Sequence, residues 1–157
     1  MSGAVDRRAY RRDVGHRSGR GLVVDDADGL DRLRPVRGEA PRRAVRAGGL
    51  EIQCAEPADY RSVRTGVVMP EGHSADAFRR IVLERYDMSL GQGLGRLSGK
   101  VFRIGHLGWF NDLMLCGTLA GVAMGLALAG VPHRKGGVDA AMGYLVDASP
   151  RALPRAA

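Results

Sequence analysis

The sequence predicts a two-layer α+β domain, in which helices cover one face of a small, mostly antiparallel sheet. Two observations lead to this fold class. Short apolar runs with the two-residue period of strands alternate with longer runs that have the period of helices. Glycine and proline separate most of these runs, which indicates short connections. With 157 residues, 45% of them apolar, the chain has the size and composition of one domain with a single core.

The N-terminal part of the chain does not share this pattern. Residues 1–39 show no sustained period of two or of three and a half residues, and they are rich in arginine, glycine and aspartate. We therefore expect residues 1–40 to be a basic segment that is disordered or frame-disrupted. The domain is then expected over residues 41–147, followed by a frayed tail over residues 148–157.

The predicted domain opens with the last turns of a helix, over residues 42–47, which end at a glycine pair. Glycine adopts the left-handed conformation that closes a helix at little cost. Apolar and polar residues alternate over residues 50–54, which predicts a half-buried strand. A second strand is expected through residues 67–69.

Ser74 is expected to cap the next helix, because a serine side chain can accept a hydrogen bond from the first turn. The apolar residues of that helix, Phe78, Ile81, Val82 and Tyr86, share one face. This pattern is typical of an amphipathic helix packed on a sheet.

A glycine-rich stretch over residues 91–95 is interpreted as a turn. It lacks the Lys-Ser/Thr pair of a phosphate-binding loop and the helix that follows directly in dinucleotide folds. A strand is then expected over residues 100–104, and Asn111 is expected to cap a long apolar helix. A last helix opens at the glycines of residues 136–137 and has its apolar side chains on one face.

The long apolar stretch, residues 113–131, carries no charge and has two interpretations. Its length of about 28 Å as a helix just reaches across a bilayer, and Gly117, Gly121 and Gly125 have the spacing of closely packed membrane helices. Its alanine and glycine content and the basic residues on both sides favour a buried helix instead. A single-span membrane protein remains the alternative.

Charge and cysteine content narrow the other functional classes. The formal charge of +7, concentrated in an arginine-rich first third, raises the alternative of a small basic binding module for nucleic acid or an acidic surface. Interspersed aspartates and the lack of interleaved aromatic residues weigh against nucleic acid.

Cys54 and Cys116 lie far apart, so we predict no disulfide framework, no metal site and a cytoplasmic location. No secretory signal is visible.

Several segments, in the same order, resemble the C-terminal part of class V pyridoxal-phosphate-dependent aminotransferases. They are TGVVMPEGHSADAFRR (65–80), LGQGLGR (90–96), GKVFRIGHLG (99–108), NDLM (111–114), GTLAG (117–121) and MGLALAGVPH (124–133). The last three segments favour the serine–glyoxylate branch over the alanine–glyoxylate branch. The resemblance extends over about two thirds of the chain, and its combination of segments is more specific than any single glycine pattern.

The resemblance implies the small domain of a fold-type-I transferase. In intact members, which are dimers, the amino group of serine passes to glyoxylate and gives hydroxypyruvate and glycine, with pyridoxal 5'-phosphate as the electron sink. The small domain closes over a cofactor held on the large domain and supplies an arginine for the substrate carboxylate. By its position in the VFRIG segment, this arginine is expected to be Arg103. An ion-paired surface arginine is the alternative, and His106 is a weaker candidate for the same cleft.

The sequence lacks the rest of such a site. The chemistry requires a cofactor lysine, an acidic partner for the pyridine nitrogen and a phosphate cup. Lys100 and Lys135, the two lysines of the chain, fall where the family's cofactor lysine does not lie. We therefore expect a truncated or frame-disrupted product that does not bind the cofactor and is inactive alone. The expected partner is either a second copy of the chain or a separate large domain.

Overall fold

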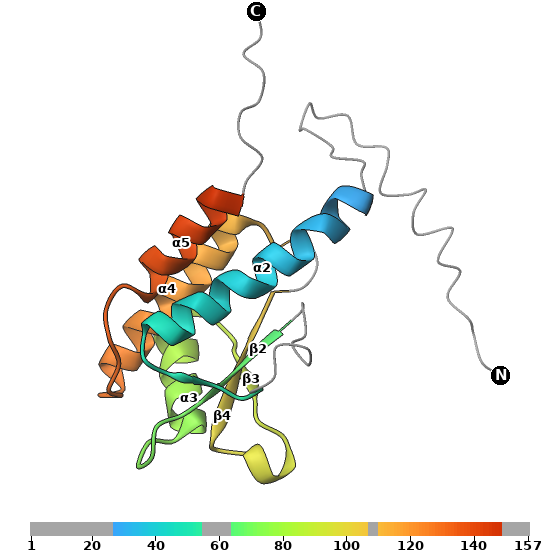
Figure 1. Cartoon of the computed structure of the whole chain (residues 1–157). Coiled ribbons are helices and arrows are strands. Elements are labelled where there is room, and N and C mark those ends of the chain that lie inside the picture. The colour runs from blue at the N-terminus through green and yellow to red at the C-terminus, as the bar shows by residue number, and fades with distance from the viewer. Residues whose placement is uncertain (1–26, 55–63, 107–109, 149–157) are drawn as a thin grey trace, which may run out of the picture.

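The computed structural model describes residues 27–54, 64–106 and 110–148. It contains four helices and a four-stranded antiparallel sheet with the strand order β1-β2-β4-β3 (Figure 1). The elements are α2 (Ala27–Ala47), β1 (Glu51–Ile52), β2 (Arg64–Val68), α3 (Ala75–Tyr86), β3 (Gly91–Gln92), the 3-10 turn η2 (Gly95–Leu97), β4 (Val101–Gly105), α4 (Asp112–Leu128) and α5 (Gly137–Ala148). The predicted α+β class is confirmed.

The register of the two central strands determines which side chains face the helices. Thr65 pairs with Ile104 and Val67 pairs with Phe102, and all four side chains are buried. Successive side chains of a strand point to opposite faces of the sheet. The helices therefore cover the face that carries Phe102 and Ile104, as predicted. The first strand is shorter than the expected residues 50–54, since only Glu51–Ile52 pair with β2.

Helix α2 is longer than the sequence indicated. Only residues 42–47 were expected to be helical and residues 1–40 were expected to be disordered or frame-disrupted, whereas α2 begins at Ala27. It includes Pro35 and is arginine-rich, so its intrinsic helix propensity is weak. Packing against α5, which buries Ala40 and Ala44, outweighs that propensity. Residues 1–26 and 149–157 lie outside the described residues, so the expectations for them stay predictions.

Ion pairs make the arginine-rich surface of α2 compatible with a packed helix. Arg42 is only 8% exposed, and its Nε donates to Glu39 Oε2 at 2.9 Å, while Arg46 lies 3.2 Å from the other carboxylate oxygen. Burial alone would raise the pKa of Glu39, but the hydrogen bonds and positive charges of Arg42 and Arg46 outweigh it and lower that pKa. Glu39 is therefore held ionised, which stabilises a guanidinium that would otherwise be costly to bury.

The predicted helix ends are confirmed. Ser74 Oγ accepts a hydrogen bond from the backbone of Ala77 at the start of α3, and Asn111 Oδ1 accepts one from Met114 at the start of α4. Gly49, with φ of +75°, closes α2 in the left-handed conformation that favours glycine. Local sequence chemistry therefore determines where these three helices begin or end.

The apolar run forms α4, which packs closely on α3. A Cβ atom added at Gly125 would collide with Val82 Cγ2, and one added at Gly121 would lie 2.8 Å from Met88 Cε. Gly117, in contrast, faces open space. Over the described residues, no helix combines the length and the apolar character needed to cross a bilayer. Two of the three evenly spaced glycines therefore serve close packing within the domain.

Replacing Gly125 with alanine is expected to destabilise the domain, and Gly117→Ala provides a matched control in the same helix. Alanine favours a helix over glycine by roughly 1 kcal/mol, and this gain applies at both positions. Only the Gly125 variant also overpacks a buried contact, at a cost of about 1–3 kcal/mol. Urea denaturation should show G125A less stable than G117A by about that cost. Equal stability of the two variants would contradict the close α3–α4 contact.

Candidate functional site

Arg103 lies at the centre of β4, with its side chain on the sheet face away from the helices. Its neighbours Phe102 and Ile104 are buried beneath the helices, so the alternation of the strand directs Arg103 to the opposite face. The strand expected from the sequence, residues 100–104, ended one residue after Arg103, but β4 continues to Gly105. The Nε atom of Arg103 is buried and has no hydrogen-bond partner among the described residues. A strand with neighbours on both sides gives this guanidinium a rigid base.

Glycines flank Arg103 on both neighbouring strands. Gly66 of β2 and Gly91 of β3 are its Cα partners in the sheet. A Cβ atom at Gly91 would lie 3.1 Å from Arg103 Cβ and 3.2 Å from its Nε, so any larger residue there would press on the arginine. At Gly66, an added Cβ would instead meet the side chain of Gln53. Gly91 therefore leaves the space that the Arg103 side chain occupies, and Gly66 leaves space for Gln53.

The stretch expected to be a single turn, residues 91–95, has a different role. Gly91–Gln92 form the edge strand β3, and the turn η2 begins only at Gly95. Glycine inside a strand often marks a close approach of another group, and that signal was present in the sequence. The identity of the approaching group, Arg103, depends on a register between segments far apart in the chain.

His106, the weaker candidate, does not join Arg103. Its Nε2 atom lies 3.1 Å from Thr65 Oγ1, and both residues are almost completely buried. Thr65 pairs with Ile104 on the helix-covered face. His106 lies two residues after Ile104, so its side chain is directed to the same face. The structure therefore places His106 in a polar contact within the core, on the other side of the sheet from Arg103.

Neither lysine accompanies Arg103. Lys100 precedes β4 and lines a hollow with Glu71 and His73, about 10 Å along the strand from Arg103. Lys135 lines a cavity bounded by Phe102, on the helix-covered face. Among the described residues, Arg103 offers an unpartnered donor, but no lysine of the kind that the cofactor of these aminotransferases requires lies beside it.

Comparison with known proteins identifies the same family that the sequence segments resemble. No family model matches the chain. The serine–glyoxylate aminotransferase of Methylorubrum extorquens is 45% identical over 126 residues, which are 79% of this chain and 31% of that protein. The enzyme of the same name from Arabidopsis thaliana is 46% identical over 110 residues, 69% of this chain and 27% of that protein. The chain thus spans less than a third of the length of these relatives.

Solved structures share the fold. Pyridoxamine–pyruvate aminotransferase from Mesorhizobium loti superposes with a TM-score of 0.72 and 25% identity, covering 77% of this chain and 31% of that structure. Ureidoglycine–glyoxylate aminotransferase from Bacillus subtilis gives a TM-score of 0.68 and 22% identity, covering 73% and 30%. The chain therefore belongs to the class V pyridoxal-phosphate-dependent aminotransferases and corresponds to the C-terminal small domain of the serine–glyoxylate type.

Proposed function

We propose that this chain supplies the substrate-carboxylate contact of a serine–glyoxylate aminotransferase, through Arg103. The observation that carries the proposal is the buried Nε atom of Arg103, which has no acceptor among the described residues and is flanked by Gly66 and Gly91. A buried donor without an acceptor costs free energy, so the site favours a ligand that brings one. Serine and glyoxylate each carry a carboxylate, whose two oxygens match the fork of a guanidinium.

Amino transfer is proposed to need residues beyond those described. The cofactor supplies the electron sink for the conversion of serine and glyoxylate to hydroxypyruvate and glycine. The described part of the chain provides no lysine beside Arg103 to hold it. The domain is therefore proposed to orient the substrate, while a large domain, of the kind that makes up the remaining length of the relatives, holds the cofactor.

Exposed apolar side chains support a partner surface. Leu113 on α4 is 83% exposed, and Val146 on α5 is 74% exposed. Met124 and Leu128, on the same face of α4 as Leu113, are about half exposed. Large apolar side chains gathered on one helix face are typical of surfaces that another chain or domain covers. A large domain or a second copy of the chain would bury them.

Carboxylate binding at Arg103 is tested by titrating the chain with L-serine while following the arginine Nε–Hε signals by NMR. The Arg103 signal is expected to shift and saturate, with a dissociation constant on the order of millimolar, because one guanidinium contact carries the binding. L-Serinamide, which has no carboxylate, should cause no such shift. Arg80→Gln, a change at an exposed arginine of α3, should leave the titration unchanged. If the backbone amide signals of Gly66 and Gly91 showed that the Arg103→Gln chain binds serine as tightly as the wild type, the proposal would be refuted.

A further inference from the structure

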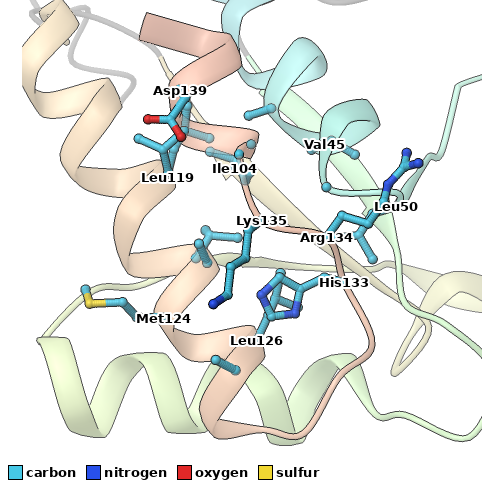
Figure 2. Close-up of a pocket in the computed structure, with 18 of the residues that line it drawn as sticks. Val45, Leu50, Ile104, Leu119, Met124, Leu126, His133, Arg134, Lys135 and Asp139 are labelled. Carbon is cyan, nitrogen blue, oxygen red and sulfur yellow. The ribbon is translucent and has the colours of Figure 1, made fainter.

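An apolar cavity of about 370 Å³ lies on the opposite face of β4 from Arg103. The end of α2, helix α4 and the loop before α5 border this half-open cavity (Figure 2). Its walls are apolar and include Leu50, Ile104, Leu119 and Leu126. Because Ile104 and Arg103 point to opposite sides of one strand, this cavity is separate from the proposed carboxylate contact. Its volume is within the range of small-molecule sites, about 300–1,000 Å³.

Basic groups from the loop before α5 line one end of this cavity. Figure 2 shows the side chains of Lys135 and His133 reaching toward the cavity, while Arg134 points away from it. Arg134 Nη2 donates instead to the carbonyl oxygen of Arg46, at 3.1 Å. His133 Nδ1 lies 2.8 Å from the carbonyl oxygen of Val131, a contact that restrains the orientation of the ring. Lys135 makes no ion pair within the described residues.

The distribution of charge indicates which end of a ligand lies where. Asp139 also lines the cavity, and in Figure 2 it lies at the far end from the ammonium group of Lys135. A carboxylate would be repelled near Asp139 and attracted near Lys135. The walls between the two ends are apolar, so they favour a hydrocarbon body over a polar one.

We propose that this cavity binds a small monocarboxylate with an apolar chain or ring. Its carboxylate pairs with Lys135 at the loop, and its apolar body lies against Leu119, Leu126 and Ile104. Lys135 is exposed at the edge of the apolar wall and pairs with no carboxylate of the described residues, so binding such a ligand breaks no existing ion pair. The proposal does not depend on the role of Arg103, which lies on the other face of the sheet.

Decanoate is the probe for this site, and the two lysines of the chain provide a matched pair of variants. Isothermal titration of the full chain should show binding of decanoate. Lys135→Gln should weaken it by about two- to fivefold, the loss expected for one ion pair at an exposed lysine. Lys100→Gln removes the same charge outside the cavity and should leave the affinity unchanged. The neutral probe decanol should bind the wild type and K135Q equally.

A second variant tests the apolar part of the site. Ala123 lines the cavity on α4, and Ala123→Leu fills part of the space without changing any charge. This variant should lose binding of both decanoate and decanol while keeping its helical circular dichroism, and Arg103→Gln should bind decanoate normally. The proposal is overturned if the wild type does not bind decanoate. It is equally overturned if K135Q and A123L both retain wild-type affinity.

Discussion

Replacing Phe78 with alanine is expected to lower the free energy of unfolding by about 3–5 kcal/mol, the cost of emptying a packed aromatic site. Phe78 is 1% exposed, and its ring centroid lies 4.7 Å from that of Phe102. It therefore joins α3 to the centre of the sheet. Since a domain of this size is stable by about 5–15 kcal/mol, the substitution should remove a large share of the total. Urea denaturation followed by circular dichroism measures the loss.

The control for this prediction lies on the same helix. Leu83 is 49% exposed, so Leu83→Ala removes a large apolar side chain that is only partly packed. We expect its effect to stay below about 1 kcal/mol, near the range of surface substitutions. If both variants lost the same stability, Phe78 would not hold the central position that the structure assigns to it.

A double variant tests whether Phe78 and Gly125 share one contact. The position of a Cβ atom at Gly125 lies 3.1 Å from Phe78 Cε2, so the methyl group of G125A enters space that F78A vacates. Residues in contact give non-additive changes of about 0.5–3 kcal/mol. The double variant should therefore be more stable than the sum of the single changes predicts. Strict additivity would show that α3 and α4 do not meet through these residues.

Local chemistry explains why most of the fold could be predicted. The caps at Ser74 and Asn111 and the closing glycine Gly49 act within a few residues of their own position. The start of α2 could not be predicted in this way. Its helical state depends on burial against α5, a segment about a hundred residues further along the chain, and on the ion pairs of Glu39. Neither contact is visible in the hydrophobic period of the sequence.

The candidate site also has one part that the local sequence predicts and one part that depends on distant contacts. The strand that carries Arg103 was predictable from its apolar neighbours and from the resemblance to class V aminotransferases. The glycines that flank it were not, because Gly66 and Gly91 meet Arg103 only through the register of β2 and β3 with β4. The cavity beside Lys135 was missed for the same reason, since its walls come from α2, α4 and β4 together.

Arg103 is expected to have its largest effect in an assembled enzyme. A suitable test is a chimera of the Methylorubrum extorquens enzyme in which this chain replaces the matched segment, which is 45% identical. In that chimera, Arg103→Gln should lower kcat/KM for serine by about a hundredfold or more. The reason is the loss of two charge-assisted hydrogen bonds, each contributing about 1.5–3 kcal/mol. Steady-state transamination between serine and glyoxylate measures the change.

Related variants separate charge, geometry and position. Arg103→Lys keeps the charge but loses the paired hydrogen bonds, so its activity should lie between those of the wild type and R103Q. Gly91→Ala places a methyl group 3.2 Å from Arg103 Nε and should cause a smaller loss of the same kind. Lys135→Gln, on the other face of β4, should leave transamination unchanged. A chimera that turns over serine equally well with glutamine at position 103 would show that the substrate carboxylate is bound elsewhere, whatever holds the cofactor.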